Sequence, residues 1–287
     1  MPRSPKGVST PSPKGVTPPI PKGAPPNRYQ AIIELIFSTH HQTGVMAFEF
    51  TRDEFVDAAL AMKLVLPKNI GDVLYSVRYR TELPQTIRDA AAPGREWIIE
   101  GAGRGRYRFS QVALNRIVPR DDLVSIKIPD ATPEIIGAYA LGDEQALLAK
   151  VRYNRLIDVF LGITSYSLQN HLRTTVAGVG QIEIDEIYVG VDRHGRQFVV
   201  PVQAKGGSDR HGVVQTQQDM ACCASKFASL LCRPVSAQFM AGGRIAMFEL
   251  TLEQGDVKVV AERHYELVRA ASISLSELRS YGDRATD

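Results

Sequence analysis

The sequence of 287 residues has little cysteine and no long apolar run. Its three cysteines, Cys222, Cys223 and Cys232, form no CxxC pair, which argues against a zinc ribbon or a dithiol redox site and favours reduced, buried thiols. No stretch reaches the roughly 18 consecutive apolar residues of a membrane-spanning helix. The N-terminus also lacks the apolar core of a secretory signal. We therefore expect a cytoplasmic protein.

The net charge of +3 is unevenly distributed along the chain. Residues 1–27 carry four basic side chains and no acid, residues 28–120 carry 13 basic and 10 acidic side chains, and the remainder is net −4. A polyanionic partner would therefore contact the N-terminal part of the chain first. Residues 1–27 also repeat Pro-Lys-Gly every eight positions, which predicts a disordered, solvated tail. The tail is either a basic arm that touches phosphates or a flexible leader with no specific role.

Residues 28–118 have the pattern of a small DNA-binding domain. Apolar spacing predicts helices over 28–41, 52–64 and 70–80, and Thr51 with Glu54 forms a capping-box signature before the second. Two strand-like runs follow, 96–101 and 106–110. Helix, helix, helix, hairpin is the order of a winged helix, in which the third helix enters the major groove and the hairpin lies along the backbone.

Arginines stand where such a domain would touch DNA. Arg78 and Arg80 lie at the end of the third expected helix, and Arg104, Arg106 and Arg108 lie on the expected hairpin. The planar guanidinium fork suits phosphate oxygens and guanine edges. The sequence therefore predicts contacts with double-stranded DNA, the alternative being an exposed arginine hairpin without a ligand.

Prolines at 119, 129 and 133 predict a linker over 119–135, followed by a second domain over 136–287. We expect helices over 131–140, 143–162 and 166–176, then two strand-like runs over about 182–187 and 199–205, a helix from about Val213, and further strands with a closing helix. The fold class is thus α/β (α+β). Period-two alternation gives each strand two faces. One face of the first strand carries Glu183, Asp185 and Ile187, the other Ile182, Ile184 and Glu186; the second strand has Val199, Pro201, Gln203 and Lys205 opposite Val200, Val202 and Ala204.

An acidic strand, the turn Asp192-Arg-His-Gly195, and an apolar strand that ends in Gln203-Ala204-Lys205 resemble the PD-(D/E)xK nuclease superfamily. The Gln-x-Lys variant is most similar to Mrr-type restriction endonucleases, over roughly residues 140–250. The resemblance implies a restriction-endonuclease-like domain with a central mixed sheet flanked by helices. The alternative for this segment is an ordinary hairpin that ends in exposed charge.

The resemblance also implies roles for these residues. Asp185 would bind Mg²⁺, or Mn²⁺ in its place. Gln203 would take the position of the second acid, and Lys205 would orient the attacking water and balance phosphate charge. Since an amide oxygen is a weaker Mg²⁺ ligand than a carboxylate, we expect a further acid, Glu183 in preference to Glu144.

Three more side chains are second-rank candidates. Gln215 and Gln218 lie on the helix after the lysine, and His171 lies on the segment before the acidic strand. Their alternatives are surface glutamines and a structural histidine.

The whole pattern predicts a metal-dependent DNA endonuclease of type II-like restriction, which hydrolyses phosphodiester bonds as a homodimer, with a cognate methyltransferase as a further partner. Two other functions fit the same sequence. A DNA-binding regulator would use the C-terminal domain without catalysis, and a repair or junction-resolving nuclease would prefer branched or damaged DNA.

Overall fold

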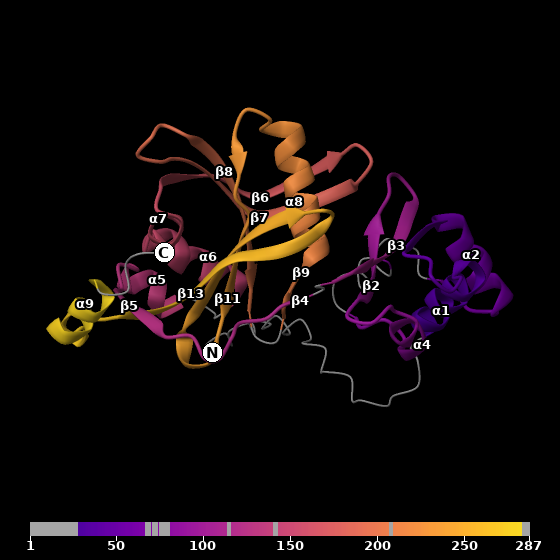
Figure 1. Cartoon of the computed structure of the whole chain (residues 1–287), viewed down its shortest axis with the longest axis horizontal. Coiled ribbons are helices and arrows are strands. Elements are labelled where there is room, and N and C mark those ends of the chain that lie inside the picture. The colour runs from indigo at the N-terminus through magenta and orange to yellow at the C-terminus, as the bar shows by residue number, and fades with distance from the viewer. Residues whose placement is uncertain are drawn as a thin grey trace, which may run out of the picture.

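The protein folds into two packed parts of mixed α+β structure (Figure 1). The structure is a computed structural model and describes residues 28–66, 70, 74, 81–113, 116–139, 143–206 and 209–282. Within these residues no helix is both long and apolar enough to cross a membrane.

The N-terminal part is a three-stranded antiparallel sheet with helices packed on it. Its elements are α1 (Arg28–His40), β1 (Ala47–Thr51), α2 (Arg52–Ala61), α4 (Gln85–Asp89), β2 (Glu96–Gly101) and β3 (Arg106–Val112), with strand order β1-β3-β2. Ile32, Phe50 and Phe109 are among its fully buried core side chains. The expected hairpin is confirmed, and Thr51 and Glu54 form the expected capping box at the start of α2.

The helix expected over 70–80 lies almost entirely outside the described residues. Ile70 and Leu74 are helical, and Leu74 is buried in the same core. Arg78 and Arg80 belong to the part that is not described, so the expected reading helix stays a prediction.

The C-terminal part is built on one mixed sheet of eight strands, with β5-β13-β12-β11-β8-β7-β6 in order and β10 beside β8. Its elements are β4 (Arg116–Ile117), β5 (Ser125–Pro129), α5 (Glu134–Tyr139), α6 (Glu144–Tyr153), α7 (Leu156–Leu161), β6 (Thr164–Val176), β7 (Gly180–Val191), β8 (Gln197–Lys205), β9 (His211–Gly212), α8 (Val213–Lys226), β10 (Leu231–Cys232), β11 (Val235–Phe239), β12 (Ile245–Glu253), β13 (Asp256–Val268) and α9 (Leu275–Gly282). The strands β6, β7 and β8 form an antiparallel meander, and β11 returns parallel to β8 after α8.

Helices cover both faces of this sheet (Figure 1). On one face α6 and α7 pack against Val200, Val202 and Ala204 of β8. On the other, the α8 residues Cys222 and Cys223 pack against Val199 and the isoleucines of β7. The period-two alternation expected for β8 is therefore confirmed.

Two expectations for the helices of this part are wrong. Residues 166–176 form the edge strand β6 rather than a helix, because long pairing with β7 and a Ser/Thr-rich composition favour the extended chain. The single helix expected over 143–162 is broken at Arg155, whose φ is 48°. The Asn154 side chain imposes this break by bonding Lys150 O, Thr132 and Ala131 N.

The expected linker is also shorter than 119–135. Residues Ser125–Pro129 form β5, which pairs in parallel with β13 and so belongs to the C-terminal sheet. Pairing here satisfies backbone groups that β13 would otherwise present at an edge.

The two parts share an apolar contact. Ile98 of β2 and Val112 of β3 lie in one buried cluster with Val213 and Val214 at the start of α8 and Phe248 of β12. An ion pair between Arg95 Nη2 and Asp256 Oδ2, at 3.3 Å, joins the same surfaces. In addition, β4 from the connecting segment pairs with β9, just after the Gln-Ala-Lys strand. The back of the hairpin is thus packed against the helix that follows the candidate site.

His211 of β9 anchors this junction. It is 1% exposed, and its Nε2 lies 2.6 Å from the Thr216 hydroxyl of α8. Burial, with the positive charges of Lys205 and Arg116, lowers the pKa of His211 to about 3 from an ordinary 6.5. The folded protein therefore keeps this imidazole neutral at a pH where the unfolded chain protonates it.

We expect His211 to make the fold acid-sensitive. Because the unfolded state binds the extra proton, stability falls as pH drops below 6.5, and falls further until about pH 3. Between about pH 7.5 and pH 5.5 the loss from this residue is about 1.4 kcal/mol. Urea unfolding at both pH values should show this loss reduced in His211→Asn but retained in the exposed control His194→Asn. Equal losses in all three proteins would contradict the assignment.

Candidate functional site

The candidate site lies where β7 separates from β8. The two strands pair only from Glu186 to Val191 of β7, so Asp185 is the first residue beyond the ladder. Instead of a main-chain partner on β7, Ala204 N of β8 donates a 2.9 Å hydrogen bond to Asp185 Oδ2. The Asp185 carboxylate is thereby held at the fork between the two strands.

The fork also breaks the expected alternation along β7. Ile182, Ile184 and Ile187 all lie in the cluster beneath α8, whereas Glu186 is bound on the opposite side by Arg152 of α6. The expectation that Ile187 shares a face with Glu183 and Asp185 is therefore wrong. The strand changes phase where it leaves its partner, which a period-two pattern cannot anticipate.

Lys205, the last residue of β8, lies next to two acids. Its Nζ is 3.2 Å from Glu144 Oε1 at the start of α6, and only 11% of its side chain is exposed. Its charge also acts on Asp185, whose ionised form it favours. A largely buried ammonium is thus matched by carboxylates from a helix and a strand, as a buried charge requires. Glu144, which the sequence ranked below Glu183, is the acid in direct contact with the lysine.

Asp185 and Glu144 both lie in an environment that opposes the ionisation of their carboxyl groups. Burial raises the pKa of Asp185, with a further rise from Glu183, while Lys205 and the Ala204 N–H counteract it. Burial also raises the pKa of Glu144, with a further rise from Asp185. The two carboxylates therefore repel one another across Lys205, and an additional cation here would relieve that repulsion.

Glu183 and His171 form a second pair beside Asp185. Glu183 Oε1 accepts a 3.1 Å bond from Arg173 Nη2 and lies 3.5 Å from His171 Nδ1. His171 has φ of 48°, an uncommon backbone conformation for a residue other than glycine. Glu183 and His171 both act electrostatically on Asp185. The structure thus brings both predicted residues to the fork.

Gln203 points toward α8, where it is buried at 1% exposed. Its Nε2 donates to both oxygens of Asp219, each at 3.1 Å, and to the main-chain oxygen of Glu183 at 3.2 Å. Its Oε1 accepts from Gln215 Nε2 at 3.4 Å. Gln218 lies on the same helix and is also buried. Gln215, which the sequence predicted as a second-rank site residue, is therefore a direct hydrogen-bond partner of Gln203.

Asp219 is the one member of this network that sequence reasoning missed. It is 2% exposed, and burial raises its pKa well above the usual range. A sequence signal existed, because Asp219 follows Gln215 by four residues and so shares its face of α8. Because buried polar groups are nearly always hydrogen-bonded, an acid on the buried side of a helix that faces a glutamine on a strand indicates that the two side chains bond each other.

The oxygen donors at the fork fit a hard divalent cation. In the described part of the chain no group of three or more His, Cys, Asp or Glu side chains is arranged to hold a metal ion. Mg²⁺, however, commonly takes only one or two protein carboxylates and completes its shell with phosphate oxygens and water. Asp185 and Glu144 provide two such carboxylates.

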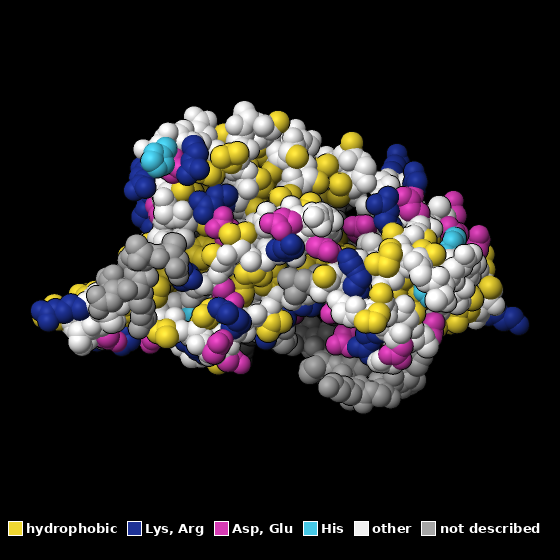
Figure 2. Space-filling model, in the orientation of Figure 1, with side chains coloured by type: hydrophobic (Ala, Val, Ile, Leu, Met, Phe, Trp, Pro, Cys, Tyr) yellow, Lys and Arg dark blue, Asp and Glu magenta, His cyan; other side chains and the backbone are white. Residues whose placement is uncertain are grey.

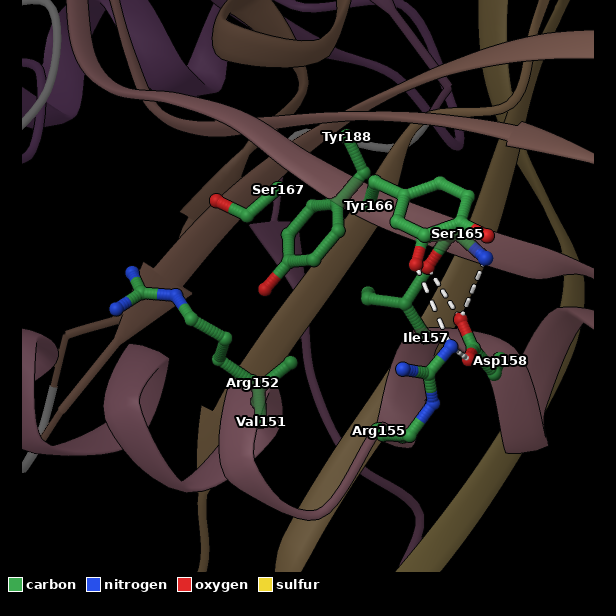
Figure 3. Close-up of a pocket in the computed structure, with 9 residues that line it drawn as sticks. All are labelled: Val151, Arg152, Arg155, Ile157, Asp158, Ser165, Tyr166, Ser167 and Tyr188. Atoms are coloured by element: carbon green, nitrogen blue, oxygen red, sulfur yellow. Dashed lines mark hydrogen bonds and ion pairs between the residues drawn. The ribbon is translucent and has the colours of Figure 1, made fainter.

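A separate pocket of about 290 Å³ lies on the α6–α7 side of the sheet (Figure 3). Arg155 pairs with Asp158 inside the pocket, and Arg152 Nε donates to Glu186 of β7 at 2.8 Å. Asp158 also accepts from Ser165 N at 2.9 Å. Figure 3 shows Arg155 and Asp158 joined in this way at one end and Arg152 beneath Tyr188 at the other. These contacts join α7 to the start of β6 and α6 to β7.

The hairpin arginines are less free than the sequence suggested. Arg106 pairs with Glu49 of β1, and Arg108 Nη2 lies 2.8 Å from the other oxygen of the same carboxylate. Hydrogen bonds from Arg108 and Arg106 lower the pKa of Glu49. Arg104, at the tip, is exposed. Over the face drawn in Figure 2, basic and acidic side chains of this part intermingle.

Comparisons of the chain with family models, curated proteins and solved structures find no match.

We expect the fork to bind Mg²⁺ through Asp185 and Glu144. Binding to the folded state alone should raise its stability by about 1.4 kcal/mol at a concentration ten times the dissociation constant. Thermal unfolding with and without Mg²⁺ measures this shift, which should vanish in Asp185→Asn and shrink in Glu144→Gln. Glu277→Gln, which removes an acid paired with Lys127 elsewhere in the fold, is the matched control. The same Mg²⁺ shift in all four proteins would rule out this site.

Proposed function

We propose that the protein is a metal-dependent endonuclease of restriction type that hydrolyses phosphodiester bonds in double-stranded DNA. One observation carries the proposal: Asp185 and Lys205 meet at the point where two antiparallel strands separate, within the order helix, three-stranded meander, helix, parallel strand. That order and that placement fit the restriction-endonuclease-like fold that the motif predicts.

Each residue at the fork has a role in this proposal. Asp185 and Glu144 would hold the cation, with the carbonyl oxygen of Gln203 as a further donor, and Glu183 would be a supporting acid. A bound divalent cation neutralises phosphate charge and acidifies a water molecule. Lys205 lies between the acids, where its ammonium positions a phosphate oxygen and offsets the negative charge that grows during hydrolysis.

The N-terminal part provides the DNA contact in the proposal. Its elements run helix, strand, helix, then the stretch over 67–80 of which only Ile70 and Leu74 are described, then a short helix and a hairpin, with the first strand beside the last. This order fits a winged helix. Cutting both strands calls for two copies of the site, hence a homodimer, and protection of host DNA calls for a cognate methyltransferase.

A DNA-binding regulator is the second candidate, favoured by the direct pairing of Lys205 with Glu144, which a purely structural ion pair also explains. In the regulator, Lys205 and its acids would be a structural ion-pair cluster. A repair or junction-resolving nuclease would use the same fork on branched DNA.

Cleavage distinguishes these functions. We expect discrete fragments from methylated or unmethylated plasmid and phage DNA with Mg²⁺ and none with EDTA. Asp185→Ala and Lys205→Ala should lower the cutting rate about 100-fold or more, while DNA binding is retained. Binding without cutting on any substrate would establish the regulator, and a preference for branched DNA would establish the repair enzyme.

The hairpin tip should contribute to DNA affinity mainly through Arg104. For each phosphate that the protein no longer neutralises, the slope of log affinity against log salt becomes shallower by about 0.9. We therefore expect a shallower slope in Arg104→Ala combined with Arg106→Ala, measured by fluorescence anisotropy across a salt series. Arg196→Ala removes an exposed arginine that is paired in the β7–β8 turn, and should leave the slope unchanged. An unchanged slope in the hairpin variant would place DNA elsewhere.

A further inference from the structure

A directional chain of hydrogen bonds passes through Gln203. The main-chain N–H of Gly212 donates to Gln215 Oε1 at 3.5 Å, and Gln215 Nε2 donates to Gln203 Oε1 at 3.4 Å. Gln203 Nε2 then donates to the carbonyl oxygen of Glu183 at 3.2 Å. Both ends of this chain are backbone groups.

The backbone ends determine which way each amide faces. A main-chain N–H can only donate and a main-chain carbonyl can only accept. Gln215 must therefore present its oxygen to Gly212, and Gln203 must present its nitrogen to Glu183. Turning either amide over would set two donors or two acceptors against each other in a buried place.

Asp219 strengthens the end of the chain that matters most for Gln203. Both of its oxygens lie 3.1 Å from Gln203 Nε2. At 2% exposed, Asp219 needs such a partner, because a buried carboxyl without hydrogen bonds is costly. The amide nitrogen of Gln203 is thus held by α8 and its oxygen remains the only acceptor of that side chain.

We propose, on the basis of the nuclease function proposed above, that Asp219 is a positioning residue that fixes which way the Gln203 amide faces, with its nitrogen toward Asp219 and the Glu183 carbonyl and its oxygen toward Gln215. Asp219 itself does not touch substrate. The arrangement also explains why this strand carries glutamine where the resembling family more often carries an acid. A glutamate at 203 would place its carboxylate against the Asp219 carboxyl and the Glu183 carbonyl.

Two substitutions of Asp219 separate hydrogen bonding from packing. D219N retains an acceptor for Gln203 Nε2, whereas D219L removes it and keeps a side chain branched at Cγ. Cys222→Ala, on the same helix and also fully buried, is the matched control for a weakened α8. All are compared by melting temperature, DNA affinity in EDTA, single-turnover cleavage with Mg²⁺, and hydrogen exchange of the Gln203 side-chain amide by NMR.

We expect D219N to cut within a few-fold of the natural protein and to keep a protected Gln203 amide. D219L should lose protection of that amide and cut about 10-fold more slowly or worse, with unchanged DNA affinity. If D219L behaves like Cys222→Ala in both amide exchange and cleavage, the positioning role is overturned.

Exchange of the acid between strand and helix provides a second test that does not depend on D219L folding. Q203E should be impaired because two carboxyl groups then face each other, and the added change D219N should recover cutting about 10-fold, since an asparagine amide can donate to the new carboxylate. If cutting does not recover, the proposal is overturned.

If the natural protein cuts no DNA, the nuclease function fails, but the Gln203 amide exchange in D219N and D219L still decides whether Asp219 positions that side chain.

Discussion

The separation of β7 from β8 at Asp185 is the constraint on which the candidate site depends. Where the main-chain ladder ends, the Ala204 N–H bonds a side-chain carboxylate instead. This exchange keeps the donor of Ala204 satisfied while the strands part. It also holds Asp185 one residue from Lys205 on the neighbouring strand. Without the fork, the two side chains would belong to an ordinary hairpin, with its polar groups in a regular ladder.

The helices on either side complete the fork from opposite directions. From one face, α6 brings Glu144 to the Lys205 ammonium. From the other, α8 brings Asp219 and Gln215 to the amide of Gln203. Each charged or polar group at the end of β8 thus has a partner that comes from a helix. Since buried polar groups are costly unless paired, the positions of both helices and of the strand end are mutually dependent.

The same helix α8 connects the site to the N-terminal part. Its first residues, Val213 and Val214, share an apolar cluster with the hairpin residues Ile98 and Val112. Directly before it, β9 pairs with β4 from the connecting segment. The packing of the hairpin and the packing of the start of α8 therefore depend on each other.

Local patterns in the sequence were sufficient for the hairpins, the capping box at Thr51 and the faces of β8. These follow from periodicity and turn chemistry, which act over a few residues. Tertiary structure decided the rest. Residues 166–176 became a strand because β7 offers a partner, Glu144 reached Lys205 from 61 positions away, and Asp219 met Gln203 across the sheet. Such contacts join distant segments through packing, and no short pattern in the chain records which of its acids the fold will bring to the fork.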